Sequence, residues 1–343
     1  MRGRSLILMV SLIAAALALV ACGGSSDSTD GGDEPQASGG GVKLSLVGYA
    51  VPKVGFDKVI PAFQKTEAGK GVTFAQSYGA SGDQSRKVEA GAPADVVNFS
   101  VEPDVTRLVK AGKVAEDWND DAHHEGLAFG STVVIVTRKG NPKGIKDWDD
   151  LLQPGLEVVT PNPFSSGSAK WNLLAPYAAK SNGGKDAAAG LAFVKKLVDD
   201  HVKVQPKSGR EATETFLQGT GDVLLSYENE ALFIEGDGED VEHVTPPQTF
   251  KIENPIAVLS SSEHPEQAKA FFDFNFTPEG QKLWAEAGFR PTDPDVAKQF
   301  ADKFPEPQKL WTIDDLGGWK TVDPELFDAD NGKIAEIYDD ATG

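Results

Sequence analysis

The segment VTFAQSYGASGDQ (residues 72–84) contains the most informative local pattern in the chain. A strand is predicted over residues 72–76, small residues follow at 77–82, and a helix is predicted over 83–90. Glycine lets the backbone approach a ligand closely, and a helix start offers backbone N–H donors with a partial positive charge. The segment therefore predicts a β–α unit with a candidate anion site at its turn.

The same pattern occurs twice more. NPFSSGSA (residues 162–169) follows a predicted strand over 156–160, and KSGRE (207–211) precedes a third predicted helix. In α/β folds, ligands bind at the carboxyl ends of strands, which is where these segments fall. Three such starts in one chain favour a site for a tetrahedral oxyanion.

Ordinary helix capping remains an alternative for each segment. Ser81 followed by Gln84 fits a capping box, and Ser208 followed by Glu211 fits one as well. Either serine could therefore cap its own helix without contacting a ligand.

Four further side chains lie near these segments. Arg86, Lys170 and Arg210 could contact an anion or pair with carboxylates, and we expect them to support the site from behind. Tyr227 stands at the end of a predicted strand, where its hydroxyl could face a ligand or could belong to a buried aromatic residue.

Strands and helices alternate through the rest of the chain, from a first strand over residues 42–47 to another over 132–137, and the pattern restarts after about residue 142. This alternation predicts an α/β fold with a mostly parallel sheet. We expect two lobes with the ligand cleft between them. Lobe one is predicted to comprise residues 43–125 plus 246–343, and lobe two residues 126–245.

The amino terminus has the pattern of a secretory signal. A short basic start precedes an apolar run over residues 6–20, and the small residue Ala21 precedes Cys22. LVAC at this point resembles the lipobox of bacterial lipoproteins. The resemblance implies a signal peptide over 1–21, cleavage before Cys22 and lipidation of that cysteine, palmitate included. The Gly- and Ser-rich stretch over 22–42 is predicted to be a flexible linker.

Charge and motifs exclude several functions. Lys plus Arg number 33 against 52 Asp plus Glu, a formal net charge of −19, which opposes binding to nucleic acid. We find no G-x-S-x-G, HExxH or Walker motif. The cluster His123-His124-Glu125 and the segment 328–332 lack the spacing of metal sites. We therefore expect no metal, no cofactor and no catalytic residue.

The sequence resembles the bacterial sulfate-binding proteins of ABC importers over nearly all of residues 43–320. That family implies a two-lobed, periplasmic-binding-protein-like (type II) fold that holds a dehydrated anion between its lobes. The stretches that carry the resemblance are SYGASG (77–82), RKGNP (138–142), TPNPFSSG (160–167), GDVL (221–224), YENEAL (227–232), Arg290-Pro291 and Phe304-Pro305.

Site residues follow from the resemblance, motif by motif. In the family, backbone N–H groups, a serine hydroxyl and a tryptophan indole hold the anion without a neutralising basic side chain. The ligand-binding residues that this implies here are Ser81, Gly82, Ser166, Gly167, Ser168, Gly209 and Tyr227.

Two positions depart from the family pattern. Tyr227 stands where the family has the tryptophan, and the family's aspartate after the first strand falls at Ala50 or Val51. A phosphate receptor needs an acceptor for the anion's proton, and Asp83 and Glu211 are the nearest carboxylates in the three loops.

The expected function is a receptor, monomeric and lipid-anchored to the outer face of the cytoplasmic membrane. It would capture sulfate or thiosulfate and deliver it to the membrane permease of an ABC importer. The alternatives are a receptor for molybdate or phosphate, and a surface hydrolase.

Overall fold

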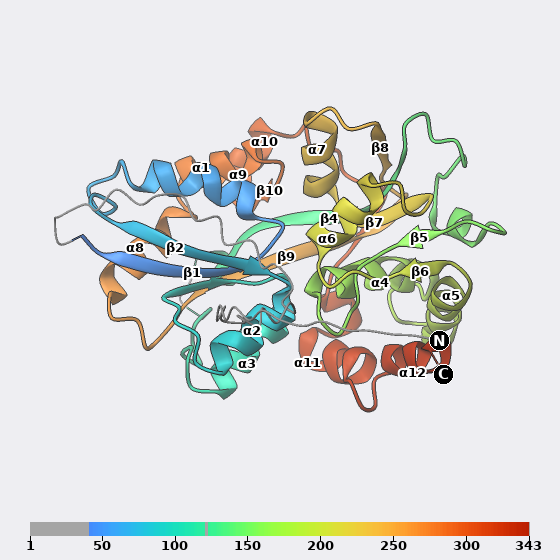
Figure 1. Ribbon diagram of the computed structural model, residues 1–343, viewed down its shortest axis with the longest axis horizontal. Coiled ribbons are helices and arrows are strands. Elements are labelled where there is room, and N and C mark those ends of the chain that lie inside the picture. Colours follow the sequence, from blue (N-terminus) through green and yellow to red (C-terminus); the bar gives the residue numbers. More distant parts are fainter. Residues whose placement is uncertain (1–40, 121–122, 343) are drawn as a thin grey trace, which may run out of the picture. The chain divides into compact units, whose positions relative to one another are not determined.

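Two long antiparallel strands, β4 (Leu127–Arg138) and β9 (Gln248–Val258), run through the middle of the sheet in the computed structural model (Figure 1). The structure describes residues 41–120 and 123–342. Along the sheet the strand order is β2-β1-β3-β9-β4-β7-β5-β6. β4 and β9 therefore join a first half that holds β1 to β3 with a second half that holds β5 to β7.

In the first half the sheet is parallel. β1 pairs with β2 and β3 in parallel, and β3 pairs with β9 antiparallel. The alternation of strands and helices predicted from the sequence is confirmed, and the antiparallel pairings come from the strands that link the halves. The elements are β1 (Lys43–Tyr49), α1 (Lys53–Phe63), β2 (Thr73–Gly79), α2 (Ser81–Glu89), β3 (Val96–Asn98), α3 (Glu102–Lys110) and the 3-10 turn η1 (His123–Gly126).

α1 begins at Lys53 and packs closely against Trp284. A Cβ at Gly55 would lie 2.0 Å from Cζ3 of Trp284, so only glycine allows the helix to approach the indole. The Phe56 ring meets the same indole edge-on at 4.9 Å between centroids. Gly55 is therefore a packing contact inside a helix.

The second half repeats the parallel arrangement around β5, which pairs with β6 and β7 in parallel, while β7 and β8 pair antiparallel with β4. Helix α4 is buried along most of its length. The elements are the 3-10 turn η2 (Trp148–Leu152), β5 (Val158–Val159), α4 (Gly167–Lys180), α5 (Ala187–Asp200), β6 (Val202–Val204), α6 (Gly209–Leu217), β7 (Val223–Tyr227), α7 (Glu228–Gly236) and β8 (Val241–Val244).

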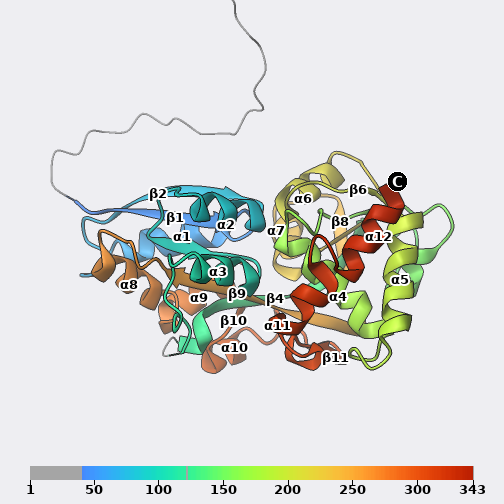
Figure 2. The same ribbon diagram turned by 90° about the horizontal axis from the view of Figure 1, so that it is seen from below.

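After β9 the chain returns to the first half and then crosses back. α9 packs against α1, whereas the last helix, α12, packs against α5 (Figure 2). The sequence analysis predicts that residues 246–343 belong to lobe one. That boundary stays a prediction, and the contacts of α12 lie with the second half. The elements are α8 (Pro265–Phe274), α9 (Pro278–Glu286), β10 (Arg290–Pro291), α10 (Pro294–Gln299), β11 (Lys309–Trp311), the 3-10 turn η3 (Asp314–Leu316), α11 (Trp319–Val322), the π-helical turn η4 (Asp323–Phe327) and α12 (Lys333–Thr342).

Candidate functional site

Three helix starts, those of α2, α4 and α6, meet at one place. The N–H of Gly82 in α2 donates to the carbonyl of Ser165, which precedes α4, at 3.0 Å. A Cβ at Gly209, the first residue of α6, would lie 2.9 Å from Oγ of Ser168 in α4. Backbone donors from helices of both halves are thus brought together, as the sequence pattern predicts for an anion site.

Ser81 is buried at the start of α2, and its hydroxyl is already hydrogen-bonded. The Oγ donates to Oδ2 of Asp104 at 2.6 Å and accepts the N–H of Ser100 at 2.9 Å. The capping box suggested by Gln84 is therefore wrong, because the Ser81 hydroxyl binds groups outside its own helix. A contact between this hydroxyl and a ligand requires the proton to turn away from Asp104.

The start of α4 places Ser166, Gly167 and Ser168 side by side, all buried. A Cβ at Gly167 would lie 2.7 Å from Cβ of Ser100, so a larger residue would push the two halves apart. Glycine at this position therefore permits close approach of α4 to the loop after β3.

At the third start, the capping interpretation is confirmed. The N–H of Glu211 donates to Oγ of Ser208 at 3.2 Å, and the Glu211 carboxylate accepts the N–H of Lys207 at 3.1 Å. Ser208 and Glu211 therefore cap the start of α6. Gly209 faces Ser168, and a Cβ at Gly209 would lie 3.3 Å from Cγ2 of Val51.

Tyr227 ends β7 and joins the same cluster. Its hydroxyl lies 2.7 Å from Oγ of Ser100, and it also interacts with Ser168. Burial raises the pKa of the Tyr227 phenol, so the hydroxyl keeps its proton and can act as a donor or an acceptor. Of the seven residues implied by the sequence, Ser81, Gly167 and Tyr227 thus lie next to Ser100.

The buried surroundings of Tyr227 include Tyr49 and Glu230. Burial raises the pKa of the Tyr49 phenol well above its ordinary value, and Tyr227 and Glu230 add to the effect. Within the described part of the chain, the Tyr49 hydroxyl has no hydrogen-bond partner. A buried donor without a partner beside this cluster is a candidate ligand contact.

No sequence pattern indicated a role for Ser100, Asp104 or Glu230. Ser100 follows β3, so the rule of strand ends applies to it, but the residues around it contain no glycine. Asp104 and Glu230 each lie within a helix, where a carboxylate usually faces water. Here Asp104 is 4% exposed and Glu230 0%.

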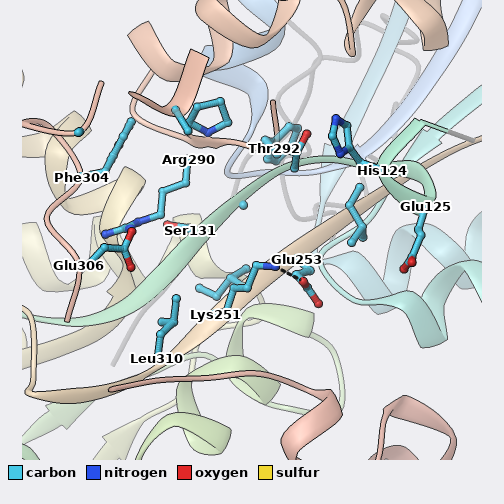
Figure 3. A pocket seen from close by; sticks show the side chains of 17 residues that line it. His124, Glu125, Ser131, Lys251, Glu253, Arg290, Thr292, Phe304, Glu306 and Leu310 are labelled. Carbon is cyan, nitrogen blue, oxygen red and sulfur yellow. Dashed lines mark hydrogen bonds and ion pairs between the residues drawn. The ribbon is translucent and has the colours of Figure 1, made fainter. Parts of the chain in front are cut away.

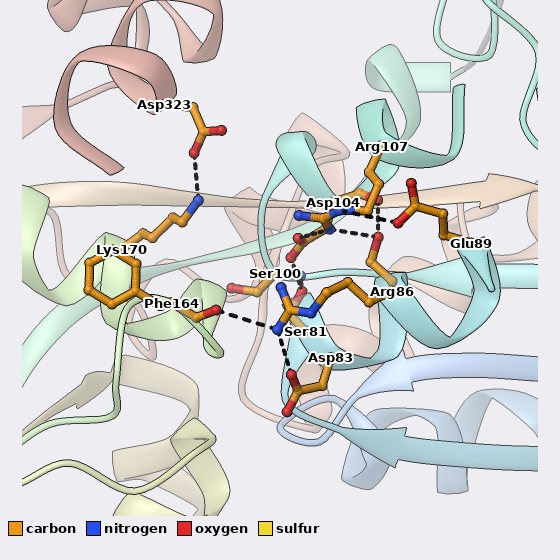
Figure 4. Close-up of polar contacts among 11 residues, drawn as sticks. Ser81, Asp83, Arg86, Glu89, Ser100, Asp104, Arg107, Phe164, Lys170 and Asp323 are labelled. Atoms are coloured by element: carbon orange, nitrogen blue, oxygen red, sulfur yellow. Dashed lines mark hydrogen bonds and ion pairs between the residues drawn. The ribbon is translucent and has the colours of Figure 1, made fainter. Parts of the chain in front are cut away.

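The three basic side chains expected behind the site are all paired. Arg86 contacts Asp83 at 2.5 Å, and its second interaction, with the carbonyl of Phe164 at 3.4 Å, spans the two halves (Figure 4). Two further pairs complete the set: Lys170 with Asp323 at 2.5 Å, and Arg210 with Glu230 at 3.1 Å.

A cavity of about 630 Å³ lies beside β4, β9 and β10, and it includes none of the seven predicted site residues (Figure 3). Its two cations are already engaged, Lys251 with Glu253 at 2.5 Å and Arg290 with Glu306 at 2.9 Å. Much of its wall is apolar, from Phe129 to Leu310. For an oxyanion, the cluster around Ser100 offers the better set of donors.

Residues 41–120 and 123–342 contain no group of three or more His, Cys, Asp or Glu side chains that could hold a metal ion. The rings of His123 and His124 lie near Phe276 instead. In the same residues, no helix has the length and apolar character needed to cross a bilayer. Cys22 and the predicted signal peptide lie outside the described residues.

The chain is similar to known solute-binding proteins in sequence and in structure. The model of the family "Bacterial extracellular solute-binding protein" matches residues 45–290. The chain is 39% identical to a sulfate-binding protein of Synechococcus elongatus, covering 96% of this chain and 95% of that one. It is 35% identical to a thiosulfate-binding protein of Pseudomonas aeruginosa, covering 86% and 92%. Among solved structures, the sulfate-binding protein SubI of Mycobacterium tuberculosis is 64% identical, with a TM-score of 0.82 over 84% of this chain and 100% of that one.

Proposed function

This chain belongs to the bacterial extracellular solute-binding proteins, and from that premise we propose that it captures sulfate, or thiosulfate, and delivers it to an ABC importer. Its role would be that of a receptor rather than an enzyme, because a solute receptor needs only reversible binding. The energy for transport would come from the importer, so the receptor requires no cofactor.

The single observation that carries the proposal is that the starts of α2, α4 and α6 lie side by side. Each helix start adds backbone N–H donors and a partial positive charge, and such donors can bind a dehydrated oxyanion without a basic side chain in contact. The hydroxyls of Ser168 and Tyr227 lie among these donors. The candidate ligand residues remain Ser81, Gly82, Ser166, Gly167, Ser168, Gly209 and Tyr227.

The charge state of the ligand depends on whether a carboxylate in the site can accept a proton from it. Monohydrogen phosphate carries a proton that must find an acceptor, whereas sulfate and thiosulfate carry none at neutral pH. Of the two suspected carboxylates, Asp83 pairs with Arg86 and Glu211 accepts the N–H of Lys207. These contacts favour a fully ionised anion, with molybdate as the next candidate and phosphate after it.

Closure would link binding to delivery. The contacts of Gly82 with Ser165 and of Ser100 with Tyr227 join residues of the two predicted lobes. We propose that the ligand stabilises this joined form because it binds groups of both lobes at once, and that the permease recognises the joined form.

The location is proposed from the amino terminus. Cleavage before Cys22 and lipidation there would tether a monomeric receptor to the outer face of the cytoplasmic membrane through residues 22–42. A Cys22→Ser variant should lose metabolic labelling by palmitate. Equal labelling of that variant and the parent chain would refute the anchor and leave the receptor proposal standing.

Thermal unfolding in sulfate-free buffer tests the ligand. The purified chain should be titrated separately with sulfate, thiosulfate, molybdate and phosphate. A ligand that binds only the folded state adds about 2.7 kcal/mol of stability at a hundredfold excess over its Kd, which a melting curve detects readily. We expect a shift with sulfate or thiosulfate at micromolar concentration and none with phosphate. No shift with any of the four would contradict the proposal.

A further inference from the structure

Each of the three converging helices carries a basic side chain within its first two turns. These are Arg86 in α2, Lys170 in α4 and Arg210 in α6. A Cβ at Gly82 would lie 3.3 Å from Nη1 of Arg86, and Arg210 directly follows Gly209. All three helices that form the proposed site therefore carry a positive charge, although the proposed ligand contacts are neutral.

Every one of these cations is held by a carboxylate. Arg86 pairs with Asp83 on its own helix at 2.5 Å, and these side chains are about half exposed, at 45% and 40%. The other two pairs are better shielded from water. Shielding matters because a buried charge pair is screened less than one at the surface.

The pair of Lys170 and Asp323 links α4 to the carboxyl-terminal segment. The distance is 2.5 Å (Figure 4). The Lys170 side chain is only 15% exposed, and its ammonium also lies 5.2 Å from the centre of the Phe327 ring. Asp323 thus reaches the first turn of α4 from a part of the chain that supplies none of the proposed ligand contacts.

The pair of Arg210 and Glu230 lies deepest. Glu230 follows Tyr227 by three residues, is 0% exposed, and lies 3.1 Å from Nη2 of Arg210. The Arg210 guanidinium also covers the Phe233 ring at 4.7 Å. A buried carboxylate this close to an anion site opposes the ligand unless a cation offsets it.

We propose that Asp83, Asp323 and Glu230 set the affinity and charge selectivity of the oxyanion site by neutralising the three cations around it. The inference rests on the proposed function. With each cation paired, the ligand is attracted chiefly by backbone dipoles and hydroxyls. An unpaired cation would add attraction in proportion to the ligand's charge, so a divalent anion would gain about twice as much as a monovalent one.

The pair of Lys170 and Asp323 provides the sharpest test, because the two possible single changes have opposite signs. Asp323→Asn leaves Lys170 unpaired and should tighten sulfate binding about three- to tenfold at low salt. Lys170→Met leaves Asp323 unpaired and should weaken binding by a similar factor. The double variant restores neutrality and should bind nearly as the parent chain does.

Isothermal titration with sulfate at two salt concentrations measures these effects. Asp273→Asn is the matched control, since it removes the same charge from the exposed pair with Lys269 on α8 and should leave the Kd unchanged. Asp83→Asn is a second probe in case Asp323→Asn does not fold, and it should also tighten binding.

The results separate the two proposals. If the parent chain binds no oxyanion, the proposed function fails and this inference fails with it. If the parent chain binds sulfate while Asp323→Asn and Asp83→Asn bind it equally or more weakly, the neutralising role is overturned and the receptor remains. A loss of affinity in both single variants and the double variant would indicate a purely structural pair.

Discussion

The hydroxyl of Tyr227 lies 2.7 Å from the hydroxyl of Ser100, and this hydrogen bond joins the end of β7 to the loop after β3. Both side chains are buried. The bond therefore connects the two halves of the molecule at the centre of the proposed anion site, where either oxygen can donate.

Tyr227→Phe removes this bond while it keeps the ring. A hydrogen bond contributes about 0.5–1.5 kcal/mol, so we expect sulfate affinity to fall about three- to tenfold. Calorimetric titration measures the change. Tyr78→Phe is the control, because the Tyr78 hydroxyl bonds to Gln76 at the exposed edge of β2. Equal affinity of the Tyr227 variant and the parent chain would exclude a role for this hydroxyl in binding.

Gly167→Ala tests the close approach at α4. The added Cβ would lie 2.7 Å from Cβ of Ser100, so the helix start must move, and we expect the affinity for sulfate to fall at least tenfold. Gly236→Ala in α7 is the matched control, since a Cβ there meets nothing within 4 Å of the described atoms. That control should keep the affinity and should not lower the melting temperature. A Gly167→Ala protein that binds as well as the control would show that this approach is not needed.

Glu230 should give the stability of the protein a particular pH dependence. Burial raises its pKa above the ordinary 4.5, with Arg210 and Thr213 opposing the shift and Glu214 adding to it. The folded state then holds the proton more tightly than the unfolded chain does. The contribution of Glu230 to stability is therefore greatest below pH 4.5 and declines as the pH rises through the raised pKa.

Glu230→Gln should abolish that part of the decline. The free energy of unfolding, measured by urea titration between pH 4 and pH 8, should fall more steeply with pH for the parent chain than for the variant. Glu239→Gln, at an exposed position, should follow the parent curve. Parallel curves for Glu230→Gln and the parent chain would mean that Glu230 has an ordinary pKa.

The carboxyl-terminal helix should be part of the core of the second half. Ile334 in α12 is 1% exposed, and truncating a buried isoleucine to alanine costs about 2–4 kcal/mol of stability. Ile334→Ala should therefore lower the free energy of unfolding by that amount, whereas Lys333→Ala on the exposed side should change it little. A small effect at Ile334 would show that α12 is dispensable.

The features that could be predicted from the sequence are those formed by residues close together along the chain. The turn after β2 and the starts of α4 and α6 carry their own glycine and serine residues, and the family fold is confirmed. The packing role of Gly55 could not be found from sequence, because its partner Trp284 lies far along the chain. Asp323 could not be found from sequence for the same reason, since 153 residues separate it from Lys170.

The pairing of β3 with β9 affects how the chain can fold. Val96 lies opposite Val258, so β3 pairs with a strand, β9, that is synthesised about 160 residues later. Until β9 is synthesised, the β3 edge of this sheet is unpaired, and the first half of the molecule cannot complete its fold. The first half of the molecule is therefore completed only after most of the chain has been synthesised.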